Sequence, residues 1–479
     1  MGAGSLGFLG MLPRLSAEEL EPGKGFVSLR PEIEPLVRLL EETSRERLLE
    51  EVAQRIKTGT TYRELLAAVM LAGVRNIQPR PVGFKFHAVL VVNSAHLASL
   101  NAPDEDRWLP LFWALDRFKG SQAQDVREGD WTMPAVDEKA LPAAGKAAAA
   151  FCEAMDAWDE ARTDVAIAAL ARTAGAQEIF DLMCRYGARD YRDIGHKAIF
   201  VANSWRTLQT IGWEHAEPVL RSLAYALLMH RNGNPAGRDA LADLPGRRNL
   251  ERLKELKPGW SGGRPDPLAT TAMLEGLRNA DWDQASGMAV ALVNGGASPQ
   301  SLWDACFQHA AELMMRRPGI LSLHACTTTN ALRFAFGQCG IDATRKFLLL
   351  QNVAFLTLFR DEVKDGVRIE ELEPLECGAD AMGDVFDDLE DDRLSAARKA
   401  LGYLQGGGDA KSFIAAAQRL IYLKGRDSHD YKFSSAVLED YGHVSAGIRE
   451  RFLAASVFWL KGSGLDDSPL VARTRAALG

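Results

Sequence analysis

Residues 31–57 read PEIEPLVRLLEETSRERLLEEVAQRIK, and this stretch decides the fold class. Its aliphatic residues recur at steps of three and four between charged residues; they are Leu36, Leu39, Leu40, Leu48, Leu49, Val52 and Ile56. Such spacing places the apolar side chains on one face of an α-helix, which repeats every ~3.6 residues. The stretch therefore predicts an amphipathic helix or a pair of helices separated by a break.

The same helical periodicity continues toward the C-terminus. It recurs in residues 61–75, 143–154, 163–174, 218–230, 284–294, 301–316, 344–360, 393–404, 410–423 and 446–460. Alternation of apolar and polar residues, the usual pattern of a half-buried β-strand, is scarce. We therefore expect an all-α fold, with two helical halves forming one large multi-helix body around a central cavity.

One interruption of the periodicity suggests where the two halves meet. Glycine and proline concentrate in residues 231–267, and both residue types interrupt helices. We place the linker region at 236–267, between an N-terminal helical half at 1–235 and a C-terminal helical half at 268–479. A short helix near 247–256 is expected inside the linker region.

Composition excludes several classes of function. The chain has 479 residues and a net charge of −8, with 47% hydrophobic and 25% charged residues. These values are ordinary for a soluble globular protein, and basic clusters for nucleic acid or anionic membranes are missing. No apolar run reaches about 18 residues, and residues 1–20 lack the basic region of a signal peptide. The six scattered cysteines contain no CxxC pair, so we expect reduced thiols in a cytoplasmic protein, with disulfide pairing as the alternative; they are Cys152, Cys184, Cys306, Cys326, Cys339 and Cys377.

Four histidines stand at or near the start of segments long enough for a helix. The segments are FHAVLVVNSAHLASL from Phe86, GHKAIFVANSWRTL from Gly195, LHACTTTNALRFAF from Leu323 and SHDYKFSSAVLEDY from Ser428. Seven positions after each histidine, nearly on the same helix face, is a small or short polar residue: Ser94, Asn203, Ala331 or Ala436. This pattern suits helices that converge on a cavity with imidazoles at one level. A single buried histidine is more often a hydrogen-bonded core residue than a metal ligand. The repetition makes a shared metal site an equal alternative.

Other candidates remain open at this level. Lys432 lies three residues after His429, on the same helix face. It could pair with an acidic residue at the surface, Asp430 or Glu439, which spacing alone favours, or act as an anionic carbamate ligand. His309 and Glu312 also have a three-residue spacing that carboxylate-bridged iron can use, but no second clean copy occurs.

Several common cofactor-binding and catalytic motifs are absent from the sequence. The sequence has no GxGxxG after a strand and no GxxxxGK[ST], so the usual folds for flavin or nicotinamide cofactors are not expected. It has neither HExxH nor GxSxG.

The four segments resemble blocks of the questin-oxidase-like family. LHACTTTNALRFAF resembles the His-led block ending in Ala-Leu-Arg, and His429 with Lys432 resembles the C-terminal His-x-x-Lys. GHKAIFVANSWRTL is similar to the middle block, while FHAVLVVNSAHLASL matches the first block loosely because the family's histidines are closer together there. The blocks follow the family order over residues 86–440, most of the chain, although each one is short and degenerate.

The resemblance implies an all-helical, cofactor-sparing oxygenase that holds one iron with four histidines and a carboxylated lysine. It nominates His87, His196, His324 and His429 as metal ligands, and it leaves His96 as the alternative to His87. It also makes Lys432 the modified lysine, a metal ligand with a catalytic role, and so reverses the preference for a surface pairing.

These observations give an expected function and its competitors. The leading expectation is an oxygenase that uses Fe(II), or another divalent transition metal, and dioxygen on an aromatic or polyketide-like small molecule. Neither nucleic acid nor a membrane is expected as a partner, and the oligomeric state is open between a monomer and a homodimer. The alternatives are a zinc-type hydrolase or lyase on the same scaffold, because zinc can activate water, and a non-enzymatic helical scaffold protein.

Overall fold

Residues 31–57 form two helices, not one. The computed structural model describes residues 25–361, 363, 366–376, 378 and 380–479. Within it, α1 runs from Glu34 to Glu42 and α2 from Arg45 to Lys57. Ser44 between them has an extended backbone (φ −64°, ψ 153°), which interrupts the helix. The apolar faces of both helices are buried, as their periodicity predicted.

Helices account for the regular structure of the remaining described chain. Those up to the predicted linker region are α3 (Tyr62–Asn76), α4 (His87–Leu90), α5 (Val92–Leu100), α6 (Leu109–Glu128), α7 (Ala147–Ala157), α8 (Glu160–Thr173), α9 (Ala176–Gly187), α10 (His196–Ile211) and α11 (Ala216–Leu227). Those from this region onward are α12 (Leu244–Arg252), α13 (Pro267–Asn279), α14 (Trp282–Asn294), α15 (Pro299–Arg316), α16 (Ile320–Gln338), α17 (Asp342–Arg360), α18 (Ala381–Asp388), α19 (Arg393–Gln405), α20 (Ala410–Lys424), α21 (Ser428–Asp440), α22 (Ala446–Ser456) and α23 (Pro469–Leu478). Among these residues β-pairing is limited to two isolated bridges, so the predicted all-α class is confirmed.

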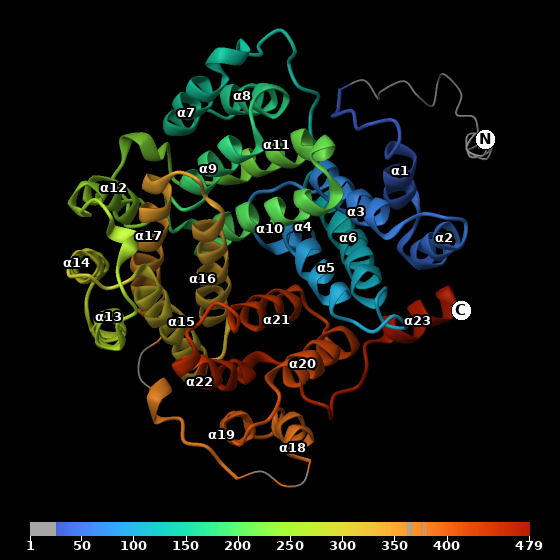
Figure 1. Cartoon of the computed structure of the whole chain (residues 1–479). Helices are drawn as coiled ribbons and strands as arrows, with labels where there is room; N and C mark the ends of the chain where they lie inside the picture. Colours follow the sequence, from blue (N-terminus) through green and yellow to red (C-terminus); the bar gives the residue numbers. More distant parts are fainter. Residues whose placement is uncertain (1–24, 362, 364–365, 377, 379) are drawn as a thin grey trace, which may run out of the picture.

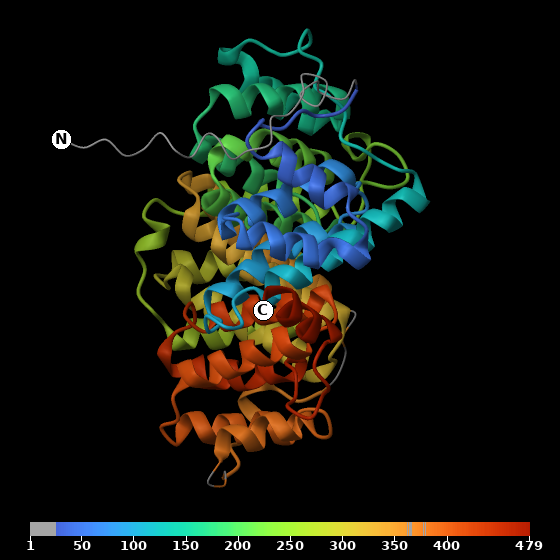
Figure 2. The same cartoon turned by 90° about the vertical axis from the view of Figure 1, so that its right-hand side faces the viewer.

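The helices of the two predicted halves interleave. Figures 1 and 2 show α7 and α8 at one end of the body, α18 and α19 at the other, and α10 and α16 between them. In this middle region α10 packs on α16, α16 on α21, and α21 on α5. Near the C-terminus α23 lies on α2, where Arg473 pairs with Glu50 at 2.7 Å. The middle of the body is thus built from segments far apart in the chain.

The predicted linker region contains ordered structure. The short helix expected near 247–256 is present as α12, and it begins three residues earlier than predicted. It packs on α17, where Asn249 Nδ2 donates to Gln351 Oε1 at 2.9 Å. The division into halves at 236–267 stays a prediction.

Two other expectations concern features distributed along the chain. No helix in the described ranges is long and apolar enough to cross a membrane. Five cysteines are described, and all five are free thiols, four of them buried. The sixth, Cys377, and the N-terminal residues 1–20 lie outside the described residues.

Candidate metal centre

Four helices present their N-terminal ends to one point in the interior. His87 is the first residue of α4, and His196 is the first of α10. His429 is the second residue of α21, and His324 is the fifth of α16. Because these helices pack together in the middle of the body, the four predicted histidines meet there.

Each of the four imidazoles contacts two of the others. His196 Nε2 lies 2.8 Å from His87 Nε2 and 2.9 Å from His324 Nε2. The ring centre of His429 is 4.6 Å from that of His87 and 5.4 Å from that of His324. One nitrogen each from His87, His324 and His429 lies within 4.8 Å of the other two. Metal–imidazole bonds of about 2.0–2.1 Å place two ligand nitrogens about 3–4 Å apart, so the group of His87, His324 and His429 could hold a single ion, and His196 adjoins this group through His87 and His324.

The partners of the outer ring nitrogens fix the tautomers. His196 Nδ1 lies 2.6 Å from the carbonyl oxygen of Asp193, and His324 Nδ1 lies 2.7 Å from that of Ile320. A carbonyl only accepts, so Nδ1 carries the proton in both rings, and Nε2 of each neutral ring has an outward lone pair. His429 has the same arrangement, because its Nδ1 lies 2.5 Å from the carboxylate of Asp427.

These tautomers leave lone pairs facing one another. Nε2 of His196 and Nε2 of His324 are 2.9 Å apart, yet neither has a proton to donate. Nε2 of His429 is buried, and no described residue forms a hydrogen bond with it. Buried acceptors normally find a partner, because an unsatisfied one costs about 1–3 kcal/mol. A cation at the point where the lone pairs converge would satisfy all three acceptors at once.

The surroundings keep the imidazoles in the form that binds metals. Burial lowers the pKa of His87, His196 and His324 well below the usual value, and charge on neighbouring groups, including Lys432, lowers it further. These rings are therefore neutral at neutral pH, as metal coordination requires.

Lys432 stands beside the histidines, as the resemblance implied. It is on α21, one turn after His429, and it is 2% exposed. Its Nζ forms no hydrogen bond with any residue in the described ranges, so the predicted surface pairing with Asp430 or Glu439 is wrong. Burial lowers the pKa of Lys432 to about 7. An amine in this position is half-neutral near neutral pH, and neutral amines react with carbon dioxide.

The backbone before His196 is strained and requires glycine. Asp193 and Ile194 have φ values of 55° and 47°, and Gly195 has a φ of 83°. A left-handed conformation costs about 1–3 kcal/mol at a non-glycine residue. The conformation directs the Asp193 carbonyl at His196 Nδ1. A Cβ on Gly195 would lie 1.9 Å from Thr328 Oγ1, so a side chain does not fit there.

The alternative histidine candidates lie outside the cluster. His96 uses Nδ1 toward the Tyr62 hydroxyl at 3.1 Å and Nε2 toward Thr210 Oγ1 at 3.3 Å, so the fold places His87 and not His96 with the other three. Glu312, the partner proposed for His309, is buried and accepts from Arg278 and Arg316. Its carboxylate is thus used in ion pairs. The assignment of His87, His196, His324, His429 and Lys432 as ligands stays a prediction.

A pocket of about 540 Å³ adjoins the cluster, and all four histidines line it. Its other walls combine apolar side chains with polar ones: Val82, Phe84, Ile194 and Ile320, and Arg117, Gln124, Asp193, Arg231 and Asp427. Phe84 is 68% exposed, so the apolar wall reaches the surface. This volume lies within the ordinary range for small-molecule sites.

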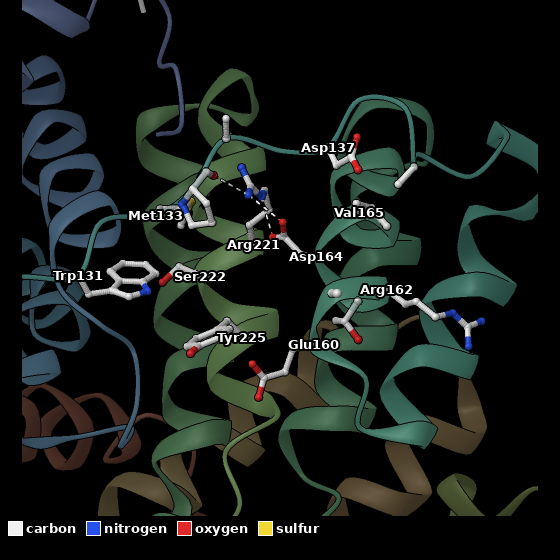
Figure 3. Close-up of a pocket in the computed structure, with 15 residues that line it drawn as sticks. Trp131, Met133, Asp137, Glu160, Arg162, Asp164, Val165, Arg221, Ser222 and Tyr225 are labelled. Carbon is white, nitrogen blue, oxygen red and sulfur yellow. Dashed lines mark hydrogen bonds and ion pairs between the residues drawn. The ribbon is translucent and has the colours of Figure 1, made fainter. Parts of the chain in front are cut away.

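A second pocket, of about 560 Å³, lies between α8, α11 and the segment 131–140 (Figure 3). Two of its charged side chains already have partners, because Arg221 pairs with Asp164 at 2.8 Å and Glu160 pairs with Arg80. No histidine or cysteine lines it. The histidine-lined pocket is therefore the stronger candidate for chemistry.

Two residues that contact the imidazoles were not found by sequence reasoning. Asp427 and Asp193 orient two of the imidazoles, yet neither was singled out. Asp427 had a local signal, because aspartate is a preferred N-cap residue and Asp427 directly precedes Ser428, the first residue of α21; its carboxylate accepts from His429 N at 2.8 Å. The carbonyl of Asp193 had no such signal. Comparison with known proteins gives no further assignment, since no protein family, curated protein or solved structure matches the chain.

Proposed function

We propose that the cluster binds one divalent transition metal through His87, His196, His324 and His429. The observation that supports this is the pair of Nε2 lone pairs at 2.9 Å between His196 and His324, which cannot bond to each other. A shared proton would also relieve them, but the lowered pKa of both imidazoles disfavours an imidazolium there. A metal ion satisfies all the convergent lone pairs without protonating a buried ring.

We further propose that Lys432 completes the site as a carbamate. The neutral amine attacks carbon dioxide, its nitrogen forms a bond to the carbon, and the nitrogen releases a proton. The product is an anionic oxygen donor, which complements an ion otherwise surrounded by neutral imidazoles. The isolation of Lys432 Nζ from any described acceptor supports this role, because a structural lysine would have a carboxylate beside it.

The proposed reaction is oxygenation of an aromatic or polyketide-like molecule. Imidazole ligands suit iron, zinc, copper and nickel alike, and the resemblance to questin-oxidase-like proteins favours iron. A bound iron would supply the electron-transfer chemistry that dioxygen requires. The apolar wall formed by Val82, Phe84, Ile194 and Ile320 suits a flat hydrocarbon body next to the cluster.

Hydrogen bonds from the protein orient three of the imidazole rings. The Asp193 and Ile320 carbonyls and the Asp427 carboxylate hold three rings by their Nδ1–H groups, which fixes both ring orientation and tautomer. Such outer hydrogen bonds raise the basicity of metal-binding imidazoles.

Metal analysis and oxygen consumption test the proposal together. Purified protein should contain one iron per chain, and His324→Ala should lose it. The matched control is His96→Ala, a buried histidine with its own hydrogen bonds outside the cluster, which should keep the metal. Oxygen uptake should appear when electron-rich phenols are added. Bound zinc with no oxygen uptake would favour the hydrolase or lyase, and wild-type protein that binds no metal would refute the proposal.

A further inference from the structure

Two guanidinium groups line the histidine pocket without an acidic partner. Arg117 is on α6, and Arg231 follows α11. Neither forms an ion pair within 4.0 Å of a carboxylate in the described ranges. Other buried arginines of this chain do pair, as Arg75 does with Glu34 at 2.8 Å. Arg117 is half-buried and Arg231 is exposed, so both guanidinium groups are free to meet a ligand in the pocket.

The pocket's own carboxylates form no ion pair with these cations, although Asp427 lies within electrostatic range of Arg117 and Asp193 within range of Arg231. Asp427 is engaged by the ring and backbone nitrogens of His429, at 2.5 and 2.8 Å. Asp193 directs its backbone carbonyl at His196, and its carboxyl Oδ2 is buried without a described hydrogen-bond partner. Nε of Arg117 is also buried and unpartnered within the described structure. A buried guanidinium N–H without an acceptor is costly, so a ligand oxygen would stabilise it.

Apart from Gln124, the remaining wall of the pocket is apolar. Val82, Phe84, Ile194 and Ile320 come from three separate segments and face the same space as the arginines. An apolar wall with two cations selects a molecule that has a hydrocarbon body and an anionic oxygen group. The guanidinium group matches such oxygens well, because it can donate two parallel hydrogen bonds.

We infer that the pocket takes an aromatic molecule bearing one carboxylate or phenolate, whose anionic oxygen is held by Arg117 and Arg231 beside the histidine cluster. This inference rests on the proposed function, since it treats the pocket next to the proposed metal ligands as the substrate site. The arginines would then determine which aromatic molecules are accepted and which part of each molecule lies nearest the histidines.

Binding of matched anionic and neutral probes tests the inference. Naphthoate should bind wild-type protein at least about tenfold more tightly than naphthamide, the margin expected for a charge-assisted contact. A nitrophenolate compared with its methyl ether provides the phenolate arm. Arg117→Gln and Arg231→Gln should each reduce the preference for the anion severalfold, and the double variant should abolish it. Arg231 is exposed, so its replacement tests the contact without endangering the fold.

Arg127→Gln is the control, because Arg127 is an exposed residue on the same helix, α6, and does not line the pocket. It should keep the full preference for the anion. Equal binding of both anions and their neutral counterparts, or a preference that survives in the double variant, would overturn the inference. Metal content measured on the same samples separates the two proposals. Metal-free protein with an arginine-dependent preference would refute the metal site alone, and metal-loaded protein without the preference would refute only the substrate class.

Discussion

Replacing Lys432 with methionine should have two effects. The variant should bind no metal, and its metal-free form should be more stable than the metal-free form of the wild-type protein. Methionine keeps most of the length and bulk of the lysine stem and lacks the amine. Lys432 is 2% exposed, and its Nζ has no hydrogen-bond partner among the described residues. Without a metal, a protonated Lys432 is therefore a buried charge with no hydrogen-bonded counter-ion, because Asp427 acts on it only from a distance. The substitution eliminates this charge.

The magnitude follows from the pKa of this lysine. Burial lowers the pKa of Lys432 from the usual 10.5 to about 7 in the fold. At about 1.36 kcal/mol per pH unit, the burial penalty is about 5 kcal/mol when the group is protonated in both states, below pH 7. Between pH 7 and 10.5 only the unfolded chain binds the proton, so wild-type stability rises with pH across this window. At about pH 9 the remaining penalty is about 2 kcal/mol.

Urea denaturation of chelator-treated protein at about pH 6 and about pH 9 measures both values. Lys432→Met should be more stable than wild type by about 5 kcal/mol at the lower pH and about 2 kcal/mol at the higher pH. Lys197→Met is the contrasting control. Lys197 is equally buried, but its Nζ lies 2.9 Å from the carboxylate of Asp190. Burial lowers the pKa of Lys197 as well, to about 8, but its loss leaves the buried Asp190 carboxylate without its closest cation, so Lys197→Met should not be more stable than wild type.

Two results would refute this reasoning. A Lys432→Met protein that is less stable than wild type at both pH values would mean that no uncompensated amine is buried in the metal-free fold. Undiminished metal content in the same variant would show that Lys432 is not a ligand.

Three further predictions concern the support of the site. Asp427→Asn should weaken metal binding about 10–100-fold, since it removes the anion that accepts from His429 Nδ1. Titration against a competing chelator measures this loss. Asp380→Asn, at the N-cap of the distant α18, is the control and should leave metal binding unchanged. Gly195→Ala should lower thermal stability by several degrees, because its Cβ would lie 1.9 Å from Thr328 Oγ1, whereas Gly145→Ala meets nothing within 4 Å and should be neutral. Residues 1–235 expressed alone contain only two of the four histidines and should retain no stoichiometric metal; full retention would contradict a site shared along the chain.

The fold class was predictable because helical periodicity is a local property. Residues 31–57 show their apolar stripe without reference to any neighbour, and even the break at Ser44 was one of two stated possibilities. Helix α6 was not predicted, although it provides one wall of the pocket. Its stretch LPLFWALDRFKGSQAQDVRE is apolar nearly all round in its first half, which hides the period.

The candidate site was only partly predictable. The four histidines were nominated from their similar positions in the segments, but their contact depends on packing between residues more than 100 positions apart, such as His87 and His196. Lys432 shows the limit of local reasoning, because spacing alone favoured the surface and only the position of α21 decides its burial. The left-handed backbone at Ile194 was not foreseeable, since β-branched residues rarely adopt it.

The order of the four histidines along the chain has a consequence for biosynthesis. His87 and His429 are separated by most of the polypeptide, and ribosomes add about 5–20 residues per second, so the first imidazole waits roughly 20–70 seconds for the last. During that interval the early histidines are exposed on an incomplete chain and can bind whichever cellular metal is most available. If the proposed metal site exists, selection of its ion would then occur by exchange after α21 has docked. The metal found in protein from a fast-expressing host would accordingly report the metal supply of that cell as well as the preference of the site.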